Sequence, residues 1–137
     1  MSRFVLDTSV AASWFFEDEG GEYPTTVLES LNNAKAFVPS LWPLEIANVL
    51  VIAERRGRCS EAEAARFIEL LDNLPITIAE NTAQRAMHAI YQLAREYGLT
   101  AYDASYMELA MRLGTPLATM DRQLADAAQK AGVSIHR

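Results

Sequence analysis

The sequence has few of the residues on which several common catalytic sites depend. It contains one cysteine, Cys59, and two histidines, His88 and His136, none of which stands at metal-ligand spacing. A single cysteine excludes an internal disulfide bond, and this scarcity argues against zinc chemistry and against a cysteine or histidine nucleophile. No GxSxG elbow occurs, so a serine triad has no support either.

Long apolar runs and excess positive charge are also missing. No run of about eighteen apolar residues occurs, and the amino terminus lacks a signal-peptide pattern, so we expect a soluble cytoplasmic protein with no membrane partner. The formal net charge of −6 opposes binding to a nucleic-acid backbone. Against this, Arg55, Arg56 and Arg58 form a local cluster, which is either a phosphate contact or a solvated helix end.

What is present fits one globular domain over residues 1–137, because half of the residues are hydrophobic and the chain can bury a sizeable core. Strands are expected at 3–6, 35–39, 76–80 and 115–119, with a short edge strand at 133–135. Helices are expected at 10–16, 22–33, 41–57, 60–73, 81–98, 102–113 and 122–132, and residues 17–20 belong to an acidic, solvated loop. This alternation of strands and helices predicts a parallel, doubly wound α/β sheet.

Helix ends and helix faces can be predicted from the same pattern. Ser60 with Glu63 forms a capping box, Asn81 with Gln84 caps the helix over 81–98, and Ser40 is a suitable N-cap for the helix over 41–57. In the helix over 81–98, a stripe of apolar side chains is expected to face the core. That stripe consists of Met87, Ile90, Tyr91 and Ala94.

The segment from 99 to 121 carries two carboxylates in unusual places. Asp103 stands in the first turn of the helix over 102–113 and heads an apolar stripe that should face the interior. The stripe consists of Tyr106, Met107, Ala110 and Met111. An acid in such a place must be paired, metal-bound or protonated. Asp121 follows a short strand, at the rim where parallel sheets bind ligands. Both acids also fit helix capping, since Thr100 with Asp103 resembles a capping box and Asp121 is an ordinary N-cap residue.

Two further acids occupy comparable positions. Asp7 directly follows the first strand and has hydroxyl side chains beside it, although a plain N-cap is the alternative interpretation. Glu45 lies in the helix over 41–57, which is apolar on nearly all sides and is therefore predicted to be buried. No Lys or Arg stands three or four residues from Glu45, so it should meet a cation or a polar cluster, unless it occupies an exposed edge.

These four acids could converge at one rim of the sheet. Asp7 and Asp121 follow strands, while Glu45 and Asp103 begin helices that should start near the same edge. Neighbouring carboxylates repel one another, and proteins usually resolve this with one or two hard divalent cations bound through oxygen. Such a site suits phosphodiester hydrolysis, because the cations activate a water molecule and neutralise charge in the transition state.

Four segments, FVLDTSV, PSLWPLEIANVL, LTAYDASYMELA and PLATMDRQLADAA, together resemble a PIN domain, and specifically the VapC-type toxins of bacterial toxin–antitoxin pairs. The resemblance runs in order over essentially the whole chain. It implies a three-layer α/β fold, with a central parallel sheet flanked by helices, and a metal-dependent endoribonuclease that uses Mg²⁺ or Mn²⁺. It also implies that Asp7 and Asp103 are direct metal ligands and that Glu45 and Asp121 complete the catalytic site.

The same resemblance implies supporting groups and partners. Thr8, Ser9 and Thr119 stand where such proteins place supporting hydroxyls. VapC-like proteins usually form homodimers and are held inactive by a small antitoxin whose tail lies over the active-site groove. We therefore expect RNA as the substrate, with a second copy of the chain and a cognate antitoxin as partners.

Two other functions remain open at this stage. A noncatalytic RNA- or protein-binding module would use the same acids as helix caps and polar packing. A phosphoryl-transfer domain, of the receiver or phosphatase type, also places acids at strand ends. A receiver needs paired acids after its first strand, and a DxD phosphatase needs a second acid close to Asp7, where this chain has Thr8 and Ser9.

Overall fold

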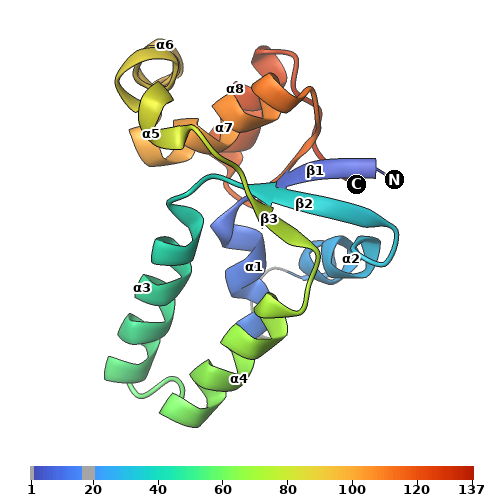
Figure 1. The fold of residues 1–137 in the computed structure, drawn as a ribbon, viewed down its shortest axis with the longest axis vertical. Helices are drawn as coiled ribbons and strands as arrows, with labels where there is room; N and C mark the ends of the chain where they lie inside the picture. Colours follow the sequence, from blue (N-terminus) through green and yellow to red (C-terminus); the bar gives the residue numbers. More distant parts are fainter. Residues whose placement is uncertain (1, 17–20) are drawn as a thin grey trace.

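The computed structural model describes residues 2–16 and 21–137. A parallel sheet runs through the centre of the molecule (Figure 1). Its strands are β1 (Ser2–Leu6), β2 (Ala34–Val38), β3 (Ile76–Ile78) and β4 (Leu117–Ala118). They are arranged in the order β3-β2-β1-β4, and every neighbouring pair is parallel. The four main strands are thus confirmed, although β3 and β4 are shorter than predicted. The expected edge strand is reduced to one bridge between Leu117 and Ile135.

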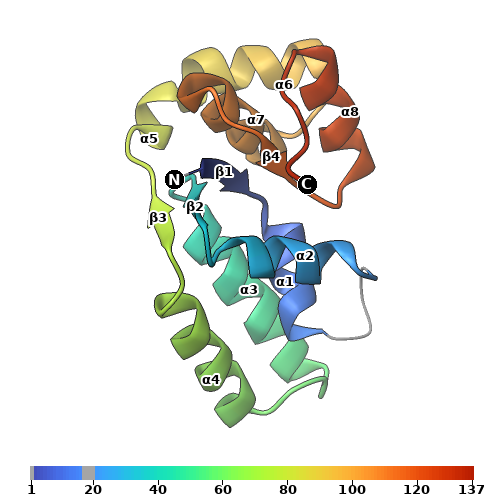
Figure 2. The same cartoon turned by 90° about the vertical axis from the view of Figure 1, so that its right-hand side faces the viewer.

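Helices cover the sheet on both sides, which confirms the three-layer α/β architecture (Figures 1 and 2). One layer contains α1 (Thr8–Phe15), α2 (Tyr23–Ser30), α3 (Trp42–Arg55) and α4 (Glu61–Asp72). The other layer contains α5 (Thr82–Arg85), the π-helix η1 (Ala86–Ile90), α6 (Tyr91–Tyr97), α7 (Ala101–Leu113) and α8 (Arg122–Lys130). The acidic loop predicted at residues 17–20 lies outside the described residues. No helix in the described ranges has the length and apolar character that a membrane crossing requires.

The central strand β1 is buried on both faces, as expected for a strand between two helical layers. Phe4, Val5 and Leu6 have no exposed surface. Since β1 lies between β2 and β4, the chain that follows it emerges next to the ends of both neighbours. This packing fixes where residue 7 and the residues after β4 meet.

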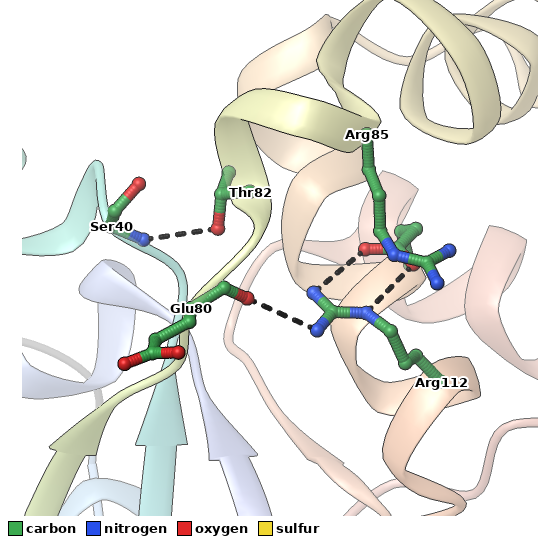
Figure 3. A network of polar contacts seen from close by, with 6 residues as sticks. Ser40, Glu80, Thr82, Arg85 and Arg112 are labelled. Carbon is green, nitrogen blue, oxygen red and sulfur yellow. Dashed lines mark hydrogen bonds and ion pairs between the residues drawn. The ribbon is translucent and has the colours of Figure 1, made fainter.

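Several predicted helix ends are confirmed and two are wrong. Ser60 and Glu63 form the complete capping box at α4. Ser40 does not cap α3, because the helix begins one residue later, after Leu41, and the Ser40 amide donates to Oγ1 of Thr82 instead (Figure 3). Asn81 makes no side-chain cap bond, because its backbone adopts a left-handed conformation with φ of 76°.

Three helices bury less of their apolar surface than the sequence predicts. α3 buries a stripe that includes Ile46 and Leu50, but Leu44 is 74% exposed. In the helix predicted over 81–98, the π-helix changes the register, so Ile90 is buried whereas Met87 is 83% exposed and Tyr91 also faces solvent. On α7 the predicted stripe is buried except at its last position, where Met111 is 44% exposed near the end of the helix.

A buried ion-pair cluster ties α7 to the segment that follows β3. Glu108 on α7 is buried and accepts hydrogen bonds from the guanidinium groups of Arg112 and Arg85. Arg112 also donates to the backbone carbonyl of Glu80 (Figure 3). The cluster therefore ties α7 to α5 and to the segment that follows the edge strand β3.

Candidate active site

The predicted acids all lie where a strand ends or a helix begins. Asp7 directly follows β1, and Asp121 directly follows the short segment after β4. Glu45 and Asp103 lie in the first turns of α3 and α7. The parallel pairing of β1 with β4 brings Asp7 and Thr119 to the same end of the sheet, although 112 positions separate them in the sequence.

Asp7 is buried and is held by two hydroxyl groups. The side chains of Ser9 and Thr119 each donate a hydrogen bond of 2.7 Å to Oδ2 of Asp7. The pKa of Asp7 is raised to about 6, chiefly by burial and also by the charges of Asp103 and Glu45, while the two hydrogen bonds act in the opposite direction. Asp7 stands at the N-cap position of α1 but makes no side-chain cap bond, so capping does not account for it.

Glu45 is also held by two hydroxyl groups. Oγ1 of Thr8 donates to Oε1 of Glu45 at 3.0 Å, and the hydroxyl of Tyr106 donates a short hydrogen bond to the same oxygen. The Thr8 and Tyr106 oxygens are themselves 2.8 Å apart. Burial, followed by the hydrogen bond to Glu45, raises the pKa of the Tyr106 phenol, which therefore stays protonated and able to donate.

Tyr106 is the residue of this cluster for which we predicted no role beyond packing. We predicted it only as part of the apolar stripe on the helix that Asp103 heads. The available signal was its chemistry, because a buried tyrosine needs a hydrogen-bond partner for its hydroxyl and a phenylalanine does not.

Asp103 and Asp121 complete the cluster. Burial raises the pKa of Asp103, and the negative charges of Asp121 and Glu45 add to this effect. Thr100 caps α7 by accepting a hydrogen bond from the Asp103 amide, as expected. Asp121 accepts one from the Leu124 amide and so acts as the N-cap of α8. Asp103 therefore interacts electrostatically with each of the other three acids.

The donor set suits a hard divalent cation that keeps part of its water shell. Within the described ranges, no three His, Cys, Asp or Glu side chains form a ready-made group around a metal position. Mg²⁺ is usually bound by one or two carboxylates and several waters, so a closed cage is not required. In Asp7 and Glu45 both hydroxyl donors reach the same oxygen, and no described residue donates to Oδ1 of Asp7 or Oε2 of Glu45. These two oxygens are thus free of described hydrogen-bond donors, as the ligand of a cation must be.

An apolar pocket adjoins Glu45. Its volume is about 600 Å³, and Glu45 forms part of its wall together with exposed side chains such as Leu44 and Tyr102. At the far end of α3, Arg56 and Arg58 line a smaller cavity of about 200 Å³, and the Arg58 guanidinium lies 4.1 Å from the Phe16 ring. The predicted arginine cluster is therefore a full helix length away from the acids.

Two comparisons with known proteins match most of the chain. The family profile described as the PIN domain matches residues 4–130. Ribonuclease VapC3 of Pyrobaculum aerophilum is 30% identical over 124 residues, which cover 90% of this chain and 93% of that protein.

Two solved structures share the fold. PAE2754 from Pyrobaculum aerophilum matches with a TM-score of 0.69 and 23% identity, covering 92% of this chain and 84% of that one. VapBC2 from Rickettsia felis, solved bound to a DNA fragment from their promoter, matches with a TM-score of 0.61 and 11% identity, covering 98% and 97% of the two chains.

Proposed function

Because this chain belongs to the PIN-domain family, we propose that it is an endoribonuclease of the VapC type, the toxin component of a toxin–antitoxin pair. The observation that carries the proposal is the convergence of Asp7, Glu45, Asp103 and Asp121 at one end of the sheet, in a chain 30% identical to a named ribonuclease. In this proposal residues 1–137 act in the cytoplasm as a single PIN domain that hydrolyses RNA.

The proposed cofactor is Mg²⁺ or Mn²⁺, with Asp7 and Asp103 as its direct ligands and Glu45 and Asp121 completing the site. When bound, such a cation supplies an activated water and neutralises charge on the leaving oxygen. The hydroxyls of Ser9 and Thr119 stabilise the ionised form of Asp7, which burial alone would disfavour.

The proposed partners are a cognate antitoxin and a second copy of the chain. Exposed apolar side chains beside the acids, including Leu44 and Tyr102, support this, because apolar surface next to a charged site is typical of a protein interface. A basic side chain from an antitoxin tail would complement the carboxylates. The resemblance to VapC-type toxins supports both partners, and a structural neighbour was solved as VapBC2.

The binding-module alternative treats the acids as helix caps and polar packing. Asp121 meets that description, since it caps α8. Asp7 does not, because it is buried, makes no cap bond and has its pKa raised to about 6. A protein that used Asp7 only for structure would gain from a neutral residue there, so the geometry favours the enzyme.

Cleavage of total cellular RNA by the purified, antitoxin-free protein tests the proposal. We expect discrete fragments with Mn²⁺ or Mg²⁺ and none with EDTA, with Asp7→Asn or with Asp103→Asn. Asp126→Asn is the matched control, because Asp126 is an exposed acid on α8. If the folded wild type cleaves nothing and gains no thermal stability from Mn²⁺, the binding module becomes the better account.

A further inference from the structure

Tyr106 connects the interior of the protein to the candidate site. It lies one turn after Asp103 on α7, and its side chain has no exposed surface. Its hydroxyl donates to Oε1 of Glu45 and lies 2.8 Å from Oγ1 of Thr8. Since Glu45 and Thr8 belong to the first turns of α3 and α1, one phenol joins three helices.

Packing alone does not require this hydroxyl. A phenylalanine would fill nearly the same volume, and a buried hydroxyl costs free energy unless it is hydrogen-bonded. Among the described residues, its hydrogen-bond partners are Glu45 and Thr8. The hydroxyl of Tyr106 therefore makes its hydrogen bonds within the candidate site.

The contact restricts a side chain that would otherwise be free to move. Glu45 is half-buried on α3 at the wall of the 600 Å³ pocket, and fixing a glutamate side chain costs conformational entropy. Thr8 and Tyr106 both donate to Oε1, while Oε2 receives no hydrogen bond from the described residues. Ser9 and Thr119 hold Asp7 in the same manner, through Oδ2 alone.

We propose that Tyr106 is a positioning residue that, together with Thr8, fixes Glu45 so that its second carboxylate oxygen faces a divalent cation at the acidic rim. The inference rests on the proposed metal-dependent nuclease, because that cation is the ligand Glu45 would meet. Tyr106 acts through Glu45 and contacts neither the RNA nor the reacting phosphate.

Calorimetric titration with Mn²⁺, beside RNA cleavage, tests the inference on Tyr106→Phe. We expect the dissociation constant for Mn²⁺ to rise about tenfold, as for the loss of one hydrogen bond to a charged group. The kcat for cleavage should fall, whereas KM for RNA should not change. Tyr97→Phe is the matched control, because it removes a phenol that lines a separate pocket with Asp126 and Lys130. Tyr97→Phe should bind Mn²⁺ and cleave RNA like the wild type.

A double-mutant cycle separates positioning from a general structural effect. In a Glu45→Ala background, Tyr106→Phe should not weaken Mn²⁺ binding any further. An equal loss of Mn²⁺ affinity in both backgrounds would overturn the inference, as would wild-type affinity and kcat for Tyr106→Phe alone.

Thr8 provides a second route if Tyr106→Phe does not fold. Thr8→Ser keeps the donor to Glu45 and should keep Mn²⁺ affinity, whereas Thr8→Val should lose it. Equal Mn²⁺ affinity of the two Thr8 variants would contradict the inference. Failure of the wild type itself to bind Mn²⁺ and to cleave RNA would overturn the proposed function and the inference together.

Discussion

At the scale of the residue, the ionised carboxylate of Asp7 lowers the free energy of unfolding of the metal-free protein. Its folded pKa of about 6 lies above the unfolded value of 3.8, chiefly because it is buried. Between these two pH values the folded state binds more protons than the unfolded state, so the free energy of unfolding falls as the pH rises through this window. At neutral pH the ionised group destabilises the metal-free protein by up to about 3 kcal/mol.

Asp7→Asn should therefore stabilise the metal-free protein at neutral pH, because the amide oxygen can still accept from Ser9 and Thr119. In urea unfolding with EDTA, we expect the variant to exceed the wild type by up to about 3 kcal/mol at pH 7.5 and to differ little at pH 4. The exposed Asp126→Asn should not show this pattern. A variant less stable than the wild type at pH 7.5 would contradict a costly ionised Asp7.

The sequence predicted the positions of the acids better than their immediate contacts. A carboxylate after a parallel strand must lie at the rim, so Asp7 and Asp121 could be placed from the strand pattern alone. The hydrogen bond from Tyr106 to Glu45 depends on how α7 packs against α3, and no local pattern determines that packing. The roles of Asp7, Glu45, Asp103 and Asp121 as metal ligands stay predictions until Mn²⁺ binding is measured.

At the scale of the element, Asp121 has a structural duty that can be separated from its charge. It caps α8, and asparagine caps helices about as well as aspartate. We expect Asp121→Asn to keep the stability of the wild type, and Asp121→Ala to lose about 1 kcal/mol in urea unfolding. RNA cleavage should fall in both variants. Full cleavage by Asp121→Asn would show that Asp121 serves only as a cap.

The ion pairs of Glu108 lead to a second prediction at this scale, on the stability lost when either arginine is removed. Arg112 is 19% exposed beside a nearly buried Glu108, so Arg112→Met should cost about 3 kcal/mol, because it removes the main partner of a buried charge. Arg85 is 44% exposed, and Arg85→Met should cost less than about 1 kcal/mol. Urea unfolding of both variants measures the contrast, and equal losses would mean that burial does not set the strength of these pairs.

The elements themselves were predictable where local chemistry fixes them. The Ser60–Glu63 capping box and the Thr100 cap depend on neighbouring residues and were placed from sequence. The π-helix was not, since its extra residue in one turn gives no signal in the spacing of Met87 and Tyr91. Both side chains were therefore predicted in the core stripe, whereas the structure shows them exposed.

At the scale of the whole molecule, apolar patterning could not tell core from surface. Leu44 and Val51 on α3 are as apolar as the buried Ile46 and Leu50, yet they are exposed around the pocket beside Glu45. Periodicity reports that an apolar face needs cover, but not whether the same chain or another supplies it. An exposed apolar face of this kind fits the proposed homodimer and antitoxin.

Cation binding by the whole protein should depend on pH through Asp7. A cation that binds only the folded state raises its stability by mass action, and it must displace the proton from Asp7 to do so. With the pKa near 6, only about one tenth of Asp7 is ionised at pH 5, so the apparent affinity for Mn²⁺ should be about tenfold lower there than at pH 7.5.

Thermal unfolding with a Mn²⁺ series at the two pH values measures this effect. We expect a large rise in Tm at pH 7.5, a smaller one at pH 5, and no rise at either pH with EDTA. The Asp7→Asn variant has no proton at this position for Mn²⁺ to displace. Its remaining Mn²⁺ affinity should therefore lack the fall between pH 7.5 and pH 5 that protonation of Asp7 causes in the wild type. A wild-type Tm that rises equally at both pH values would show that Asp7 is not among the groups that hold the cation, and the ligand set would then have to be sought around Asp103.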